Sequence, residues 1–247
     1  MALDKAANFG AARNFEKQRI SLGPKSYQTY HNRHFNDILR LCEKHGIEHR
    51  LPMNMTPLMA AAAAGNVPLV EALIERGANR DNIDHFGLNA FPWALRSAFN
   101  SAEFASRQLP PLYELLAPPS IDFNHGERLI RIDRHLSEYF LVQTCWARFK
   151  LVFSYPQNRP GLFDATGIET LWHRLPTSIV SSARRKRSAI SGVLSRNEVD
   201  RDYAYNRALF SRLAHGGYQF NPKLAIRQTQ HGESSWQPIL STLNLPL

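Results

Sequence analysis

Apolar residues in the stretch 55–88 recur at helical spacing and predict a pair of short helices. The second half of this stretch places four apolar side chains on one helix face, namely Leu69, Val70, Leu73 and Ile74. Gly65 breaks the apolar stretch ahead of this face and Gly77 ends it, as glycine often does at the close of a helix. The stretch is therefore expected to hold two helices separated by a glycine turn.

A second apolar pattern, from residue 129 to residue 153, predicts one long helix. Its apolar positions recur at intervals of three and four, so one broad stripe should face a neighbouring element. A membrane span needs about 20 nearly uncharged residues. This stretch is interrupted by Arg131, Asp133, Arg134, Glu138, Arg148 and Lys150. The pattern therefore predicts a soluble helix.

The last third of the chain passes from helical spacing to alternation. Residues 163–175 predict one helix, and residues 178–197 predict a short helix, a turn and a longer helix with a basic outer side. Two β-prone runs follow, 209–213 and 218–220, separated by A-H-G-G. Because glycine supports positive φ, this spacing predicts a tight β-hairpin.

Residues 55–88 resemble one complete ankyrin repeat, a unit of about 33 residues with a β-turn and two antiparallel helices. The opening T-P-L at 56–58 and the closing G-A at 77–78 carry the resemblance. It implies a surface that binds another protein rather than a catalytic site. The exposed turn tips that would contact the partner are Asn54, Asn79, Asp81, Asp84, His85, Phe86 and Asn89.

Two neighbouring stretches carry parts of the same pattern. Thirty-three residues after Thr56, Asn89 opens a similar turn, which implies a second unit whose last helix lies at 111–117. That helix comes late, so we expect an insertion at 100–109 to bulge from the turn between the two helices. Upstream, residues 35–47 resemble the second helix of a preceding unit. The resemblance implies two and a half to three units, close to the fewest that form a stable stack.

The helices and hairpin of the last third resemble a winged helix-turn-helix over about 65 residues. The resemblance implies that the second helix of the turn, about 184–195, enters the major groove of duplex DNA. Carried over by position, the base readers are Arg184, Arg187, Ser188 and Ser191. Phosphate contacts would come from Arg185, Lys186 and Arg196, and wing contacts from Arg212, His215 and Lys223. The connection 197–206 is acidic and longer than is usual for this fold, which leaves the helix boundaries open.

Charge is divided unevenly along the chain. Residues 1–128 contain 14 Lys and Arg against 13 Asp and Glu, whereas residues 129–247 contain 16 against 8, so nearly all of the net charge of +9 lies in the second half. Its densest point is R-R-K-R at 184–187. A basic face neutralises phosphates and releases counterions from nucleic acid. Charge runs are most often solvated loops or helix caps, but concentration in one module favours nucleic-acid binding.

Few side chains offer catalytic or metal chemistry. Cys42 and Cys145 are expected to be buried, reduced thiols on helix faces. Zinc is the alternative for one cluster, because His31, His34, Cys42, His45 and His49 lie within nineteen residues. The ankyrin pattern argues against it, since it turns Cys42 inward. The sequence contains no convincing nucleophile, P-loop or dinucleotide fingerprint. We therefore expect no enzymatic activity, no cofactor and no metal.

Length and composition complete the prediction. A chain of 247 residues, 43% hydrophobic and 21% charged, is typical of an ordinary globular protein with two modules. The expected fold is mainly α: a short ankyrin-repeat stack, a long capping helix and a winged-helix-like α+β domain. The predicted parts are an N-terminal extension at 1–26, repeats at 27–125, a capping and linking helix at 126–160, and the basic domain with its tail at 161–247. The residues at 1–17 do not resemble a secretory signal, so a cytoplasmic location without membrane contact is expected.

Two classes of function fit these features. In the first, a DNA-binding regulator or accessory factor docks on duplex DNA and holds a protein partner through its ankyrin stack. In the second, an adaptor or inhibitor uses the basic module to bind an acidic protein surface without nucleic acid. The first is favoured because a basic winged helix binds nucleic acid readily through counterion release, and RNA is a further alternative.

Overall fold

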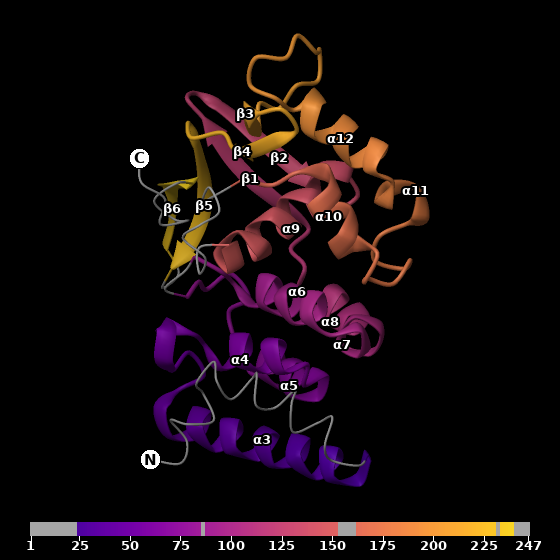
Figure 1. Cartoon of the computed structure of the whole chain (residues 1–247). Helices are drawn as coiled ribbons and strands as arrows, with labels where there is room; N and C mark the ends of the chain where they lie inside the picture. The colour runs from indigo at the N-terminus through magenta and orange to yellow at the C-terminus, as the bar shows by residue number, and fades with distance from the viewer. Residues whose placement is uncertain (1–23, 85–86, 153–161, 231–232, 240–247) are drawn as a thin grey trace.

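A computed structural model describes residues 24–84, 87–152, 162–230 and 233–239 (Figure 1). Among these residues, none of the helices combines the length and the hydropathy that crossing a bilayer requires. The N-terminal half is a stack of helices. In chain order they are α3 (Pro24–His45), the 3-10 turn η1 (Pro52–Asn54), α4 (Pro57–Ala64), α5 (Val67–Glu75), α6 (Ala90–Asn100), α7 (Ala102–Arg107) and α8 (Leu109–Leu116).

Short polar caps define the α4–α5 pair, as the sequence predicts. Thr56 Oγ1 accepts a hydrogen bond from the Met59 backbone N–H (3.3 Å), which caps α4. Asn66 Oδ1 accepts from the Leu69 N–H (3.3 Å) and caps α5. Between the helices Gly65 has φ +71°, a left-handed conformation that glycine adopts without strain. The two-helix prediction for 55–88 is confirmed.

Hydrogen bonds between residues one repeat apart hold the helical units in register. The Asn82 amide donates to Glu48 Oε2 (2.6 Å), the Arg50 guanidinium to the Ile83 carbonyl (2.9 Å), and Ser97 Oγ to the Ala63 carbonyl (2.7 Å). These pairs are 33 or 34 residues apart in sequence. The spacing is that of stacked repeats, each of which satisfies polar groups of its neighbour.

The expected insertion at 100–109 is helical and packed rather than a bulge. It forms α7, whose Phe104 and Ala105 side chains are buried. The following helix, α8, begins at Leu109 and not at Pro111. Prolines at 110 and 111 fit there because the first turn of a helix leaves its N–H groups without intrahelical partners.

A four-stranded antiparallel sheet, which the sequence did not predict, lies beyond the stack. Its strands are β1 (Ser120–His125), β2 (Arg128–Asp133), β5 (Leu224–Gln230) and β6 (Glu233–Pro238), in the order β2-β1-β5-β6. The predicted long helix is therefore wrong for its first residues. Ile130 and Ile132 are buried while Leu129 and Arg131 are exposed, which is the alternation of a strand. Within the described part of this segment, only α9 (Ser137–Val152) is helical, and the expected boundary at 125/126 falls at the turn between β1 and β2. Residues 153–160 of the predicted helix lie outside the described residues.

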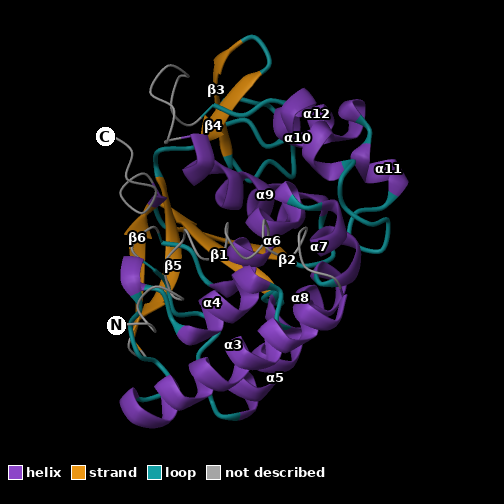
Figure 2. Cartoon of the chain, turned by 60° about the horizontal axis from the view of Figure 1, so that its bottom comes forward, coloured by secondary structure: helices purple, strands orange, loops and turns teal. Residues whose placement is uncertain are grey.

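The remaining elements are α10 (Ala165–Trp172), α11 (Ser182–Arg185), α12 (Arg187–Arg196), β3 (Phe210–Ala214) and β4 (Gly217–Phe220). Strands β3 and β4 pair as the predicted antiparallel hairpin, with Phe210 opposite Phe220. Figure 2 shows α9 at the centre of the molecule. It packs against α6 of the stack and against α10 and α12. Trp172 Nε1–H donates to Thr144 Oγ1 (2.8 Å), so a buried hydrogen bond joins α9 to α10.

Candidate functional site

Helices α11 and α12 carry most of the residues predicted to bind nucleic acid. Arg184 and Arg185 end α11, Lys186 lies at the break, and Arg187 begins α12. The predicted recognition helix at 184–195 is thus two helices. On α12 the side chains of Ser188 and Ser191 are exposed between Arg187 at one end and Arg196 at the other.

Two of these arginines already bind the protein's own backbone. Arg184 Nη2 donates to the His135 carbonyl (2.7 Å), and Arg185 Nε donates to the Val180 carbonyl (2.7 Å). Arg184 therefore lies against the turn that precedes α9, and the Arg185 side chain is half-buried. Lys186 and Arg187 are exposed, as is Arg184.

The hairpin positions differ among themselves. Arg212 Nη2 binds Glu198 Oε2 (2.8 Å) and the Tyr218 hydroxyl (2.6 Å), so its charge is partly neutralised within the protein. His215 is exposed at the hairpin turn, and Lys223 is exposed just before β5. The hairpin begins at the far end of α12, where the Phe210 N–H donates to the Asn197 carbonyl (3.0 Å).

The turn tips predicted to bind protein are partly structural. Asn79 Oδ1 accepts from the Asp81 N–H (2.9 Å), and Asn89 Oδ1 accepts from the Phe91 N–H (3.3 Å) and caps α6. Asn54 has φ +61°, and its carbonyl accepts from Arg50 Nη1 (3.0 Å). Asp81 is exposed and follows directly on the loop that leaves α5. His85 and Phe86 lie outside the described residues.

Asp84, another of the predicted contact residues, is buried, since only 4% of its surface is accessible. Its Oδ1 accepts from the Leu88 N–H (2.8 Å) and its Oδ2 from the Trp93 indole N–H (3.0 Å). These bonds close the turn before α6, and such satisfied buried groups stabilise a fold rather than face a partner.

A comparison with known families shows which kind of repeat these residues form. Residues 53–85 match the ankyrin repeat family. The match confirms the resemblance seen at 55–88 and supports a role in protein–protein interaction for the ankyrin repeat. Comparisons with curated proteins and with solved structures gave no significant match.

Zinc is the alternative prediction for the histidines and Cys42 within 31–49, of which the side chain of His31 lies outside the described residues. Within the described part of the chain, no group of three or more His, Cys, Asp and Glu side chains is placed to hold a metal ion. His45 and His49 stack with ring centroids 4.8 Å apart. Cys42 and Cys145 are both buried, as expected, and burial raises the pKa of each thiol.

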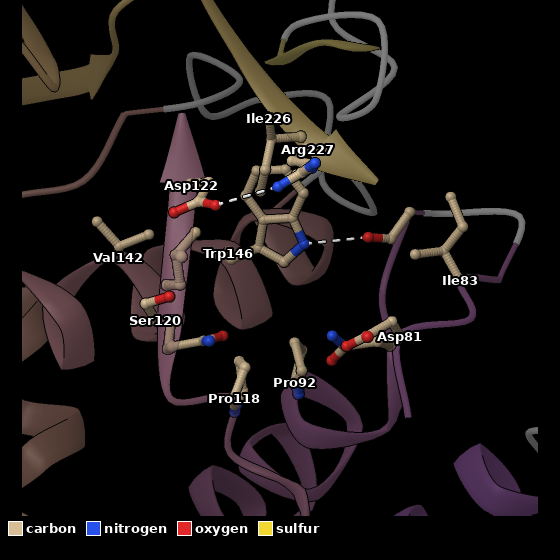
Figure 3. A pocket seen from close by; sticks show the side chains of 14 residues that line it. Asp81, Ile83, Pro92, Pro118, Ser120, Asp122, Val142, Trp146, Ile226 and Arg227 are labelled. Atoms are coloured by element: carbon tan, nitrogen blue, oxygen red, sulfur yellow. Dashed lines mark hydrogen bonds and ion pairs between the residues drawn. The ribbon is translucent and has the colours of Figure 1, made fainter. Parts of the chain in front are cut away.

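A cavity of about 180 Å³ lies where the ankyrin repeat meets α9 and the sheet (Figure 3). The segment 76–89 between α5 and α6, called the ankyrin loop below, lines it with Asp81 and Ile83. Trp146 lines it from α9, Asp122 from β1 and Arg227 from β5. Trp146 Nε1–H donates to the Gly87 carbonyl (3.2 Å), which ties α9 to the ankyrin loop. Of these residues, sequence reasoning named only Asp81, because nothing local in the sequence brings residue 227 beside residue 122.

Electrostatics at the sheet side of the cavity centre on Asp122. Its carboxylate accepts from Arg131 Nε and Nη2 (2.8 and 3.0 Å) and lies 3.6 Å from Arg227 Nη1. The hydrogen bonds from Arg131 lower the pKa of Asp122 below its usual value. Asp122 is thus held firmly by Arg131 and more loosely by Arg227.

Proposed function

We propose that this protein is a non-enzymatic binding protein, a regulator or accessory factor that holds a protein partner through its ankyrin repeat and duplex DNA through α12. The protein-binding half rests on the ankyrin family match. The DNA-binding half rests on the geometry and charge of the C-terminal elements.

The order of these elements supports a winged-helix reading. The chain runs from α9 through an extended residue, Phe163, to α10, then α11 and α12, and then the β3–β4 hairpin. Phe163 pairs antiparallel with Tyr218 of β4, through hydrogen bonds of 2.8 and 2.9 Å. Apart from the four-residue α11, this order of a helix, an extended residue, two helices and a hairpin that pairs with that residue is the arrangement of a winged helix-turn-helix. In this reading α9 is its first helix and α12 its recognition helix.

The exposed face of α12 is the observation that carries the DNA proposal. Its ten residues are about 15 Å long, comparable with the roughly 12 Å width of the major groove. Lys186 and Arg187 stand at one end and Arg196 at the other, with Ser188 and Ser191 between them. Cations at the two ends of such a helix can contact phosphates on both sides of the major groove. The small polar side chains between them can reach the edges of the bases.

A salt titration of duplex binding tests this proposal. Wild type should bind duplex DNA with an affinity that falls steeply as salt rises. Lys186→Ala/Arg196→Ala should reduce the slope of log K against log salt by about 2, because two phosphate contacts are lost. Arg40→Ala/Arg107→Ala is the matched control, since it removes the same charge from exposed sites on the helical stack. Equal losses in both variants, or no duplex binding at low salt, would contradict DNA recognition by α12.

One observation favours the alternative of a protein-only adaptor. Apolar side chains are exposed around the hairpin, with Leu213 53% and Tyr205 73% accessible. Arg212, the predicted wing contact, is paired with Glu198. Exposed apolar groups beside a neutralised arginine suit contact with a protein surface. In that case the same titration would show no duplex binding, while a captured protein partner would slow amide hydrogen exchange in the β3–β4 hairpin.

Hydrogen exchange tests the protein-binding half. A specific partner captured from the native cell should slow amide exchange in the ankyrin turn at 79–84. Protection confined to other elements would mean that the ankyrin turn is not the contact surface.

A further inference from the structure

The cavity beside the ankyrin loop is sized for a single side chain. Its volume of about 180 Å³ is well below the 300–1,000 Å³ typical of sites for metabolites and cofactors. It opens between elements that are distant in sequence: the ankyrin loop, α9, β1 and β5 (Figure 3). A residue projecting from a protein bound to the ankyrin turn could enter it, whereas a nucleotide could not.

The lining suits a long basic side chain. Ile83, Pro92 and Pro118 supply apolar walls, along which the methylene stem of a lysine or arginine can lie. The Trp146 ring forms a further wall, and its indole N–H is already bonded to the Gly87 carbonyl. An indole with its polar edge satisfied offers its aromatic surface to a cation.

The exposed carboxylate of Asp81 supplies the charge for such a ligand. Asp81 comes from the ankyrin loop, on the side of the cavity across from β1 (Figure 3). Within the described residues, the backbone N–H of Asp81 donates to Asn79, and the Asp81 carboxylate makes no hydrogen bond or ion pair. A guanidinium or ammonium group that reaches Asp81 would gain an ion pair at the site where the ankyrin turn contacts its partner.

We propose that this cavity binds one arginine or lysine side chain of the protein partner, with Asp81 as its counter-ion and Arg227 as an internal competitor. The proposal rests on the protein-binding function of the ankyrin repeat. Arg227 lies 3.6 Å from Asp122, a carboxylate already bound at 2.8 Å by Arg131, and its side chain is 53% exposed. Arg227 also lines the cavity, with its guanidinium 6.0 Å from the centroid of the Trp236 ring, so it adds a positive charge beside the space that a basic ligand would use. Its positive charge lowers the affinity for that ligand.

Capped tripeptides test the chemistry of the cavity on the full chain. The probes are acetyl-Gly-Arg-Gly-amide and its Gln and Glu counterparts, titrated to about 10 mM, where even a millimolar ligand occupies most sites. The readout is the Trp146 indole N–H resonance, with the buried Trp93 and Trp172 indoles as references. The Arg peptide should shift the Trp146 resonance, and the Glu peptide should not.

Paired variants determine the sign of the charge that the cavity prefers. Asp81→Asn should weaken binding of the Arg peptide about fivefold, because it removes a partly exposed ion pair. Arg227→Gln should strengthen it by a similar factor. Asp202→Asn and Arg107→Gln, which make the same charge changes at distant exposed sites, should leave it unchanged. A resonance that moves with the Glu peptide, weaker Arg binding in Arg227→Gln, or no shift at all would overturn the proposal. Protection of the turn at 79–84 by a partner would still stand if the peptide fails, so the two proposals fail separately.

Discussion

The ankyrin repeat and the four-stranded sheet differ in how far along the chain their contacts reach. Within the repeat, helices α4 and α5 are capped by residues no more than three positions away, such as Thr56 with Met59. In the sheet, by contrast, β1 pairs with β5, which places Phe123 opposite Ile226. Both regions are well buried, so burial alone does not separate them. What separates them is whether neighbours in space are neighbours in sequence.

The largest effect is expected at the centre of the sheet. Phe123 is fully buried on β1, and Phe123→Ala should lower the free energy of unfolding by about 3–5 kcal/mol through lost burial and a cavity. Urea unfolding followed by circular dichroism measures it. Asn124→Ala, one position along and half-buried, is the control and should cost far less. A loss under about 1 kcal/mol at Phe123 would mean that the sheet adds little to the core.

A glycine pair tests the local geometry of the repeat. Gly65 has φ +71°, and a Cβ there would lie 2.7 Å from Phe104 Cε2. Gly65→Ala should therefore cost about 2–4 kcal/mol, from left-handed strain plus a clash. Gly77 has φ +88° with open space around it, so Gly77→Ala should cost only the strain, about 1–2 kcal/mol. The difference between their urea midpoints isolates the packing of α7 on the α4–α5 turn, and equal midpoints would refute that contact.

Asp84 tests whether the turn before α6 is structural. Asp84→Asn replaces one acceptor with an N–H₂ group, so either the Leu88 N–H or the Trp93 indole loses its partner. We expect a loss of about 1–3 kcal/mol in thermal or urea unfolding. Asp81→Asn, at an exposed position in the same turn, should leave stability nearly unchanged. The reverse ranking would make Asp84 a surface residue after all.

The smallest effect concerns the acid stability of the sheet. Because Arg131 lowers the pKa of Asp122 below 3.8, the ion pair stabilises the folded state above that value. The stabilisation is lost as pH falls through the lowered pKa. Wild type should thus lose stability more steeply than Asp122→Asn as the pH falls below about 4. Thermal melts across that range measure how the stability of each protein depends on pH. Parallel curves would show that the ionisation of Asp122 is not linked to folding.

The sequence predicted the secondary structure correctly where the pattern of an element is complete within a short stretch of the chain. It predicted the α4–α5 pair, the helix at α10 and the β3–β4 hairpin. It misjudged residues 129–132, where Leu129 and Ile132 fit a helix stripe but Ile130 and Ile132 are the buried positions of a strand. Four residues alternating over so short a run do not separate the two periods. The sheet also depends on the pairing of β1 with β5, which joins segments far apart in the sequence, so no local pattern predicts it.

The same contrast governs the candidate sites. The basic cluster at 184–187 is visible in the sequence because its members are adjacent. The sequence did not show that Arg184, Arg185 and Arg212 are partly bound within the protein. The acceptors of Arg184 and Arg212, the His135 carbonyl and Glu198, come from other parts of the fold, whereas the Val180 carbonyl that binds Arg185 is only five residues away. The cavity was invisible for the same reason. Its walls come from the ankyrin loop, α9, β1 and β5, and only the folded chain assembles them.

The central position of α9 affects how deletion experiments on this protein should be designed. Trp146 of α9 bonds to the ankyrin loop at Gly87, while Glu138 of the same helix binds Arg207 and Asn197 near the end of α12. Removing residues 224–239 as a dispensable tail would strip β1 of one of its two partner strands, β5, and open the cavity beside the ankyrin loop. A truncation series would then assign the loss of partner binding to residues 224–239 alone, although the ankyrin loop, α9 and β1 also build the cavity. Point substitutions that leave the sheet intact are the better tool for separating the two binding surfaces.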